Sequence, residues 1–147
     1  MQPKPDVIRV PVERILPLRQ KILRAGMPGL SARFDGDENP TTVHLGALID
    51  GAIVGCVTFL DSTYEGSPAW QLRGMAVDAS YQGGGIGRIL LEEGKRILDA
   101  VGPRRPWWCN AREGAAGFYE KLGWKKVSDR FEIPTVGPHY RMLLSPV

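Results

Sequence analysis

The sequence has few of the side chains that form covalent or metal cross-links. It contains two cysteines, Cys56 and Cys109, each inside an apolar run, and two histidines, His44 and His139. So few thiols and imidazoles, spread along the chain, argue against a disulfide framework and against a metal site. We therefore expect both cysteines to be small buried residues in a reducing compartment, and we expect no metal cofactor.

Long apolar runs and a strong excess of one charge are also absent. No run approaches the roughly 18 apolar residues of a membrane-spanning helix, and no signal-peptide pattern is present. The net charge is +3, and the basic residues form neither a stripe nor an array alternating with aromatic residues. We therefore expect a cytoplasmic protein with neither a membrane nor a nucleic acid as a partner, although the positive charge suits a small anionic ligand.

The composition that remains is that of an ordinary globular protein. The chain has 147 residues, of which 43% are hydrophobic and 24% charged, and this predicts one domain, 1–147, with a buried core. The order of the apolar segments is β-α-β-β-β-α-β-α-β-β, which indicates an α/β or α+β fold with a mixed sheet. The expected strands are 7–12, 43–49, 53–60, 69–77, 106–111, 124–133 and 140–144, the expected helices are 13–24, 86–101 and 114–122, and a turn is expected at 62–68.

Three local features refine this outline. Asp50-Gly51 between two apolar segments predicts a tight hairpin. Gly74 lies inside an expected strand, which indicates a bulge or a place where another group lies against the backbone. The acidic residues Asp35, Asp37 and Glu38 stand between glycine and proline, and we interpret them as a solvated turn in preference to a catalytic or metal-binding cluster.

The stretch from Trp70 to Leu91 has the pattern of a strand, a loop and a helix, and four of its glycines, between positions 83 and 87, fall where the helix begins. The first backbone N–H groups of a helix lack intrahelical partners and carry a partial positive charge. Glycines without Cβ let a phosphate approach the main chain closely. The stretch therefore predicts an anion cradle, and a pyrophosphate is the anion that suits it best.

Two other glycine-rich motifs fit this loop poorly. The dinucleotide fingerprint G-x-G-x-x-G needs a third glycine, but Leu90 takes its place when the count starts at Gly85, and Arg88 when it starts at Gly83. The next parallel strand, 106–111, offers no carboxylate for a ribose, and no Gly-Lys-Ser/Thr of a P-loop follows. A nucleotide-only site and a purely structural glycine turn are therefore the less favoured alternatives.

Two separate segments resemble a known family. Gln82–Gly87 (QGGGIG) resembles the acyl-CoA motif Q/R-x-x-G-x-G/A of the GNAT acetyltransferase superfamily, in its usual place between the central strand and the next helix. Asn110, followed by 115–124 (AAGFYEKLGW), is similar to the family's N…A…FYEKLGF segment. The resemblance covers 43–144, and it is nearest to a branch of mostly uncharacterised bacterial members. It implies a single-domain GNAT-like fold: a mixed, mostly antiparallel sheet of about seven strands flanked by helices, with a splayed parallel strand pair.

The resemblance implies acetyl-CoA (coenzyme A) as a cosubstrate. In the family the pyrophosphate lies on the amides of the glycine loop, and the pantetheine arm lies between the two splayed strands, where backbone groups pair with it. Arg88 would add charge at a phosphate or, alternatively, be an ordinary surface arginine of the helix. The implied cofactor-binding residues are Met75, Ala76, Val77, Gln82, Gly83, Gly84, Gly85, Ile86, Gly87, Arg88 and Asn110.

For catalysis the resemblance points to Tyr119, which occupies the position of the family's tyrosine acid. A phenol with a pKa of about 10 stays protonated at neutral pH and can give a proton to a thiolate whose conjugate thiol has a pKa of about 8.5. The alternative is an aromatic side chain packed against the sheet beside Phe118.

The general base is the second catalytic role to assign. Gln71 falls where some members, notably histone-type ones, carry a glutamate base, and a glutamine does not accept a proton at neutral pH. His139, in the closing hairpin that often borders the family's acceptor site, is the favoured base, and His44 is the other imidazole. A hydrogen-bonded strand histidine, a substrate contact and a water chain to bulk solvent are the alternatives.

The expected function is transfer of an acetyl group from acetyl-CoA to a primary amine by direct attack, without a metal. The acceptor, a small molecule or a peptide, would be contacted by Gln71, Arg73 and His44, and Arg73 would favour an acceptor with a carboxylate or phosphate. A module that binds acyl-CoA without turnover is the alternative, because the strand glutamate is missing. A homodimer is left open, since the exposed edges of such sheets often pair.

Overall fold

The computed structural model describes residues 3–27 and 29–146, and the chain forms two compact units. Two long strands, β3 (Ala52–Tyr64) and β4 (Ser67–Val77), run from one unit into the other. The first unit consists of Met1–Leu60 and Gly74–Pro103, and the second of Asp61–Arg73 and Arg104–Val147.

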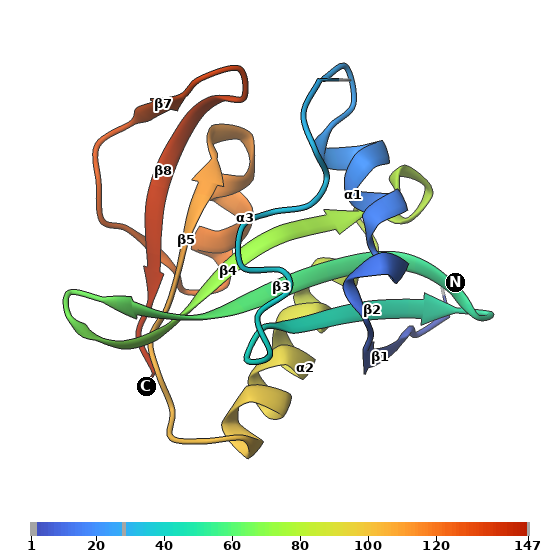
Figure 1. Cartoon of the computed structure of the whole chain (residues 1–147), viewed down its shortest axis with the longest axis horizontal. Helices are drawn as coiled ribbons and strands as arrows, with labels where there is room; N and C mark the ends of the chain where they lie inside the picture. Colours follow the sequence, from blue (N-terminus) through green and yellow to red (C-terminus); the bar gives the residue numbers. More distant parts are fainter. Residues whose placement is uncertain (1–2, 28, 147) are drawn as a thin grey trace. The chain divides into compact units, whose positions relative to one another are not determined.

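The strands form a mixed sheet, hydrogen-bonded in the order β1-β2-β3-β4-β5-β8-β6, with β7 paired to β8 (Figure 1). The β4–β5 pair is parallel, which confirms the expected mixed and mostly antiparallel sheet. Among the residues that the structure describes, the sheet has eight strands instead of about seven, because the expected strand 124–133 is divided into β6 (Lys125–Lys126) and β7 (Phe131–Ile133). At this break the Oγ of Ser128, instead of a backbone carbonyl, accepts the N–H of Arg141 at 2.8 Å.

The strands of the first unit are antiparallel to one another. β1 (Asp6–Arg9) is an edge strand on β2 (Val43–Ile49), and β2 pairs with β3 through the expected Asp50-Gly51 hairpin. Helix α1 (Leu16–Leu23), which lies between β1 and β2 in the sequence, begins later than the predicted start at residue 13, after a 3-10 turn. Pro17 explains this start, because proline is tolerated in the first turn of a helix and not in its interior.

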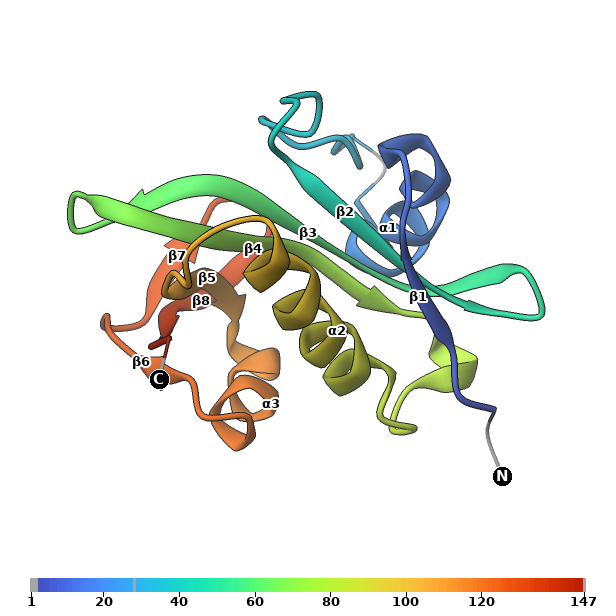
Figure 2. The same cartoon turned by 90° about the horizontal axis from the view of Figure 1, so that it is seen from below.

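Helices α1 and α2 (Ile86–Ala100) pack on opposite faces of the strands in the first unit, as Figure 2 shows. Gly55 of β3 faces α2, since a Cβ at this position would come within 2.8 Å of Ile86 and 3.1 Å of Leu90. The next residue, Cys56, belongs to a buried apolar cluster with Leu18 of α1. Successive strand residues point to opposite faces, so this alternation places one helix on each face.

The second unit is built around β5 (Trp107–Arg112). It pairs in parallel with β4 between Trp70 and Trp107 and between Gln71 and Trp108, and it pairs antiparallel along its whole length with β8 (Gly137–Leu144). The splay that the resemblance implies would open beyond these two parallel pairs and stays a prediction. The broad turn expected at 62–68 is wrong: β3 and β4 continue to a two-residue turn, because polar side chains at an exposed hairpin do not interrupt backbone pairing.

An aromatic cluster fills the core of the second unit. The short helix α3 (Ala116–Lys121) places Tyr119 against Trp124, with ring centroids 5.1 Å apart, and Trp124 lies 6.3 Å from Trp107 of β5. All three rings are buried. This packing fixes α3 on the strand face that carries Trp107, Cys109 and Ala111.

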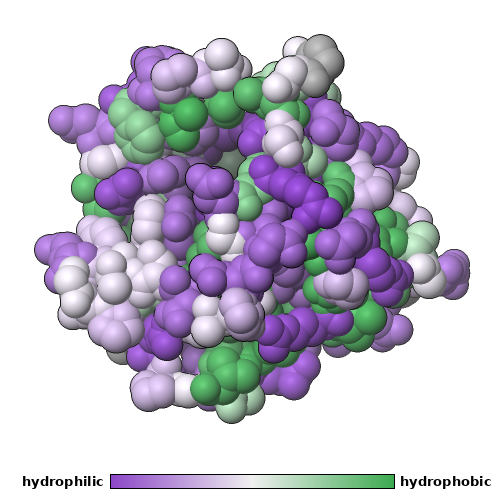
Figure 3. All heavy atoms as spheres, in the orientation of Figure 1, coloured by the Kyte–Doolittle hydropathy of each residue, from purple (hydrophilic) through white to green (hydrophobic). Residues whose placement is uncertain are grey.

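Hydrophilic side chains are spread over the face shown in Figure 3, and hydrophobic ones form small separate groups between them. Among the described residues, the large hydrophobic side chains exposed to solvent are Ile8, Val101 and Val127. In residues 3–27 and 29–146, no helix combines the length and the hydrophobicity needed to cross a lipid bilayer.

Candidate functional site

The glycine loop lies between the end of β4 and α2, entirely in the first unit. Gly85 is the N-cap of α2 at φ 87°, a left-handed conformation that favours glycine, and no side chain caps the helix start. The N–H groups of the first turn are therefore not bonded by a capping side chain and point out of the helix end. This geometry suits an anion such as a phosphate, as the glycine pattern predicts.

Two side chains of this loop have defined partners. The Nε2 of Gln82 donates a hydrogen bond to the carbonyl of Val77 at 2.9 Å, which ties the loop to the last residue of β4. Arg88 forms an exposed ion pair with Glu92 at 2.9 Å, one helical turn away. This is the surface-arginine alternative, and an Arg88–phosphate contact would require that pair to open.

Gly74, three residues before the end of β4, has φ 62°, a left-handed conformation that bends a strand locally. A Cβ at Gly74 would lie 2.9 Å from Nε of Arg19 and 3.0 Å from the ring of Phe34. The expectation that another group lies against the backbone here is therefore confirmed, and the group is an arginine–phenylalanine pair. Beyond the bend, Ala76 is buried, while Met75 and Val77 are partly exposed.

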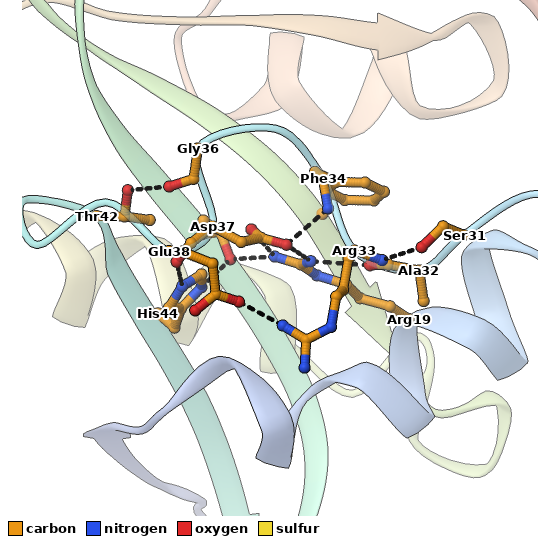
Figure 4. Close-up of polar contacts among 12 residues, drawn as sticks. Arg19, Ser31, Ala32, Arg33, Phe34, Gly36, Asp37, Glu38, Thr42 and His44 are labelled. Atoms are coloured by element: carbon orange, nitrogen blue, oxygen red, sulfur yellow. Dashed lines mark hydrogen bonds and ion pairs between the residues drawn. The ribbon is translucent and has the colours of Figure 1, made fainter.

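A buried polar network surrounds that arginine (Figure 4). Arg19 has a relative exposure of 0% and donates to both carboxylate oxygens of Asp37, at 2.7 and 3.0 Å, and to the Oγ1 of Thr58 at 2.7 Å. His44 completes the network, with Nδ1 2.8 Å from Thr58 Oγ1 and Nε2 3.0 Å from the carbonyl oxygen of Asp37. A carbonyl only accepts, so Nε2 carries the proton and Nδ1 of the neutral ring accepts from the threonine hydroxyl.

Asp37 therefore corrects the interpretation of residues 35–38 as a solvated turn. Asp35 and Glu38 are exposed, but Asp37 is buried, because the guanidinium of Arg19 compensates its charge. Burial acts to raise the pKa of Asp37, and the hydrogen bonds from Arg19 and from the Phe34 amide outweigh it, so the pKa is lowered.

Arg19 was missed by sequence reasoning, although its spacing contains a signal. Counted from Ile15, the residues Leu18, Arg19 and Ile22 are at i+3, i+4 and i+7, the positions that face the core in a helix. A charged residue in such a stripe indicates a buried ion pair or a functional arginine. His44 shares the same environment, with 6% exposure, and it lines an open depression of about 500 Å³ together with Glu13 and Asn39.

The second unit carries the predicted tyrosine. Tyr119 is 5% exposed, and its ring meets Phe118 edge-on at 5.1 Å as well as Trp124. Burial raises the pKa of the Tyr119 phenol well above its ordinary value, and the neighbouring Cys109 adds to the shift. The side chain is therefore both a packed aromatic ring and a phenol that stays protonated at neutral pH.

His139 lies on β8 in the same unit and is 4% exposed. Its Nδ1 donates to the carbonyl of Gly137 at 2.7 Å, and its ring stacks on Phe131 with centroids 6.0 Å apart. With the proton on Nδ1, the lone pair of the neutral ring is on Nε2, which is the nitrogen a general base uses.

The remaining predicted residues of this unit lie on β4 and β5. Gln71 and Arg73 are partly exposed, and Gln71 is in register with Trp108. Asn110 accepts a hydrogen bond from Nε of Arg141 at 3.2 Å, which would have to be exchanged or shared for a cofactor contact.

The structure thus assigns the predicted site residues to two sets. The first unit contains His44, Met75, Ala76, Val77, Gln82, Gly83, Gly84, Gly85, Ile86, Gly87 and Arg88, and the second contains Gln71, Arg73, Asn110, Tyr119 and His139. Both cysteines are buried and free, as expected. Within the described part of the chain, no group of three or more His, Cys, Asp or Glu side chains is arranged to hold a metal ion.

Comparisons with known proteins agree with these observations. Residues 40–126 match the family described as "Acetyltransferase (GNAT) domain". The chain is 31% identical over 140 residues, 93% of each chain, to an uncharacterized N-acetyltransferase, YitI, of Bacillus subtilis (strain 168).

Solved structures show the same fold at low identity. An acyl-CoA N-acyltransferase from Pseudomonas aeruginosa has a TM-score of 0.79 and 18% identity, covering 95% of this chain and 99% of that one. An aminoglycoside 6'-N-acetyltransferase complexed with coenzyme A has a TM-score of 0.71 and 18% identity, covering 97% of both chains. The glycine loop, the sheet order and these likenesses place the chain in the GNAT superfamily of N-acetyltransferases.

Proposed function

We propose that this protein transfers the acetyl group of acetyl-CoA to a primary amine. The start of α2 is the observation that carries this proposal, because an uncapped helix end preceded by glycines suits the pyrophosphate of coenzyme A. The Gln82–Val77 hydrogen bond supports it, since it joins that loop to the β4 segment 75–77, whose backbone would pair with the pantetheine arm. The coenzyme A complex of the aminoglycoside acetyltransferase, which has the same fold, is a further support.

The chemical step is direct attack of the amine on the thioester. The amine nitrogen forms a bond to the carbonyl carbon, the carbon–sulfur bond breaks, and the amine loses a proton while the thiolate gains one. We assign the first proton transfer to Nε2 of His139, whose tautomer leaves a lone pair there. We assign the second to the phenol of Tyr119.

The environment of Tyr119 has two opposite effects on this role. The raised pKa keeps the phenol protonated at every neutral pH, so the donor form is always populated. The same shift makes proton release less favourable while the carbon–sulfur bond is intact, so Tyr119 first donates a hydrogen bond to the sulfur as negative charge develops on it and passes the proton to the sulfur as that bond breaks. Removing the hydroxyl should therefore lower kcat more than it changes the KM for acetyl-CoA.

The acceptor contacts are assigned to Gln71 and Arg73 of β4, and Arg73 favours an amine that also carries an anionic group. His44 stays a candidate contact, since it lines the open depression together with residues 9–13 and 37–39. Its two ring nitrogens are both hydrogen-bonded, so a direct contact would replace one of those bonds.

The test is thiol release from acetyl-CoA across a panel of amines, with wild type, Tyr119→Phe and Phe118→Leu. We expect turnover with at least one amine, a fall in kcat of about 10²-fold or more for Tyr119→Phe, and a small effect for the neighbouring Phe118→Leu. If Tyr119→Phe matches wild type, the tyrosine is not the acid. If coenzyme A binds and no amine supports turnover, the protein is a non-catalytic acyl-CoA-binding module.

A further inference from the structure

The geometry points to Arg19 as a positioning residue of the acyl-CoA site: held by Asp37, it maintains the bend at Gly74 and thereby sets the backbone of Met75–Val77. This inference rests on the proposed function, in which that backbone receives the pantetheine arm. All of the contacts that carry it lie within the first unit.

Glycine alone does not fix the bend, because it adopts positive and negative φ about equally. Residues in the left-handed region interrupt the pairing of an ordinary strand, and Gly74 has φ 62° in the interior of β4. Its α-carbon lies against the guanidinium of Arg19, so closely that a methyl group there would be 2.9 Å from Nε. Its carbonyl accepts from the thiol of Cys56 at 3.5 Å. The peptide at the bend is therefore in contact with an arginine of α1 and a cysteine of β3.

The orientation of Arg19 is fixed on all sides. Its two terminal nitrogens donate to Asp37, to Thr58 and to the carbonyl of Ala32, and its guanidinium lies 4.3 Å from the centroid of the Phe34 ring. Its Nε, which faces Gly74, is buried without a hydrogen-bond partner. An arginine that leaves one donor unbonded in the interior is held by its other contacts, because an unpaired buried donor is unfavourable by itself.

The cost of this arrangement indicates a role beyond stability. Buried ion pairs contribute little net stability compared with apolar residues of similar size, since both charges lose their hydration. Here the pair also organises the loop 32–37, because Arg19 donates to the carbonyl of Ala32 and Asp37 accepts from the amide of Phe34. Unlike apolar side chains, the pair places a rigid, planar group of defined orientation at the α-carbon of Gly74.

The exit from this segment is anchored separately. The N–H of Asp78, directly after β4, donates to the carbonyl of Val54 at 2.8 Å. Residues 75–77 are thus held at one end by the bend and at the other by β3 and by Gln82. Loss of the arginine would release the first of these two anchors while the second remains.

The decisive variant is Arg19→Met/Asp37→Asn, which removes both charges and keeps an acceptor for the Phe34 amide. Because no charge is left uncompensated, we expect it to fold with a melting temperature close to that of wild type. We expect the dissociation constant for coenzyme A, measured by calorimetry, to rise about tenfold, because the backbone donors and acceptors are no longer preorganised. The amide NMR signals of Met75–Val77 should broaden from exchange between conformations.

Lys21→Met is the matched control, since it removes a cation from the same helix but breaks only an exposed ion pair with Asp78. Both measurements should stay at the wild-type values in this control. If Arg19→Met/Asp37→Asn does not fold, Arg19→Lys replaces it: lysine keeps the charge but lacks the planar group, and the same weakening of binding is expected.

The possible failures are distinguishable. A folded variant with unchanged affinity and unchanged signals at Met75–Val77 overturns the positioning role while leaving the proposed function intact. A wild-type protein that does not bind coenzyme A overturns the proposed function, and the NMR comparison still decides whether Arg19 holds the bend.

Discussion

The side chain of Gln82 donates a 2.9 Å hydrogen bond to the backbone carbonyl of Val77, and so couples the glycine loop to the end of β4. In Gln82→Glu the side chain is nearly the same size but, ionised, no longer donates. It also places a negative charge where a pyrophosphate is proposed to bind. We expect the KM for acetyl-CoA to rise by about tenfold or more with a smaller change in kcat, as measured by initial rates. An unchanged KM would contradict a role of this residue in cofactor binding.

Gly85 allows a direct test of the loop conformation. The substitution Gly85→Ala places a Cβ on a residue with φ 87°, which should cost roughly 1–2 kcal/mol in the free energy of unfolding. A Cβ there would lie 3.6 Å from Arg88, an ordinary contact, so the expected loss of stability comes from the backbone conformation and not from crowding.

The control for this substitution is Gly117→Ala in α3. A Cβ there meets nothing within 4 Å, and alanine favours a helix, so stability should stay the same or rise slightly. Urea unfolding of both variants checks the pair. Equal stability of Gly85→Ala and wild type would show that the loop adopts another conformation in solution.

The Arg19–Asp37 pair predicts a pH dependence of stability. The pKa of Asp37 is lowered in the folded state from an ordinary value of 3.8, so the folded state favours the charged form. The stability that this supplies is present above that ordinary value and is lost as the pH falls through the lowered pKa. We therefore expect the gap in unfolding free energy between wild type and Asp37→Asn to be constant from pH 7 to 5 and to shrink below about pH 4.

Replacing Arg19 alone should strongly lower the free energy of unfolding. Arg19→Met leaves the Asp37 carboxylate buried without a cation, and an uncompensated buried charge typically costs about 3–5 kcal/mol. Denaturant unfolding at pH 7 measures this loss, and the double variant with Asp37→Asn should recover most of it. Additive effects of the two substitutions would contradict a direct pair.

The two cysteines should be unreactive in the folded protein. Burial raises the pKa of the thiols of Cys56 and Cys109 to about 12 each, so neither carries thiolate at pH 8. A thiol reagent such as 5,5'-dithiobis(2-nitrobenzoic acid) should label neither residue in buffer and both in urea. Rapid labelling of one thiol in buffer would show that its surroundings open locally.

Most of the sheet follows from local patterns. Apolar runs and the Asp50-Gly51 turn predict β2 and the hairpin correctly, because both depend on neighbouring residues. The ends of β3 and β4 could not be predicted from residues 62–68, since pairing there depends on the two strands facing each other and not on the hydrophobicity of either. The division of 124–133 depends likewise on Arg141, whose N–H bonds to a distant serine.

The glycine loop, the tyrosine segment and membership of the GNAT superfamily were determined by the sequence alone, because a glycine-rich loop and a helix are encoded by consecutive residues. Only the tertiary structure decided which side chains pair with the buried Arg19. The partners of Arg19, Asp37 and Thr58, lie 18 and 39 positions away in the sequence. Residues so far apart meet only when the chain packs, so no local sequence pattern predicts the contact. The packing of Arg19 against these partners accounts for the burial of Asp37, the proton position on His44 and the contact at Gly74.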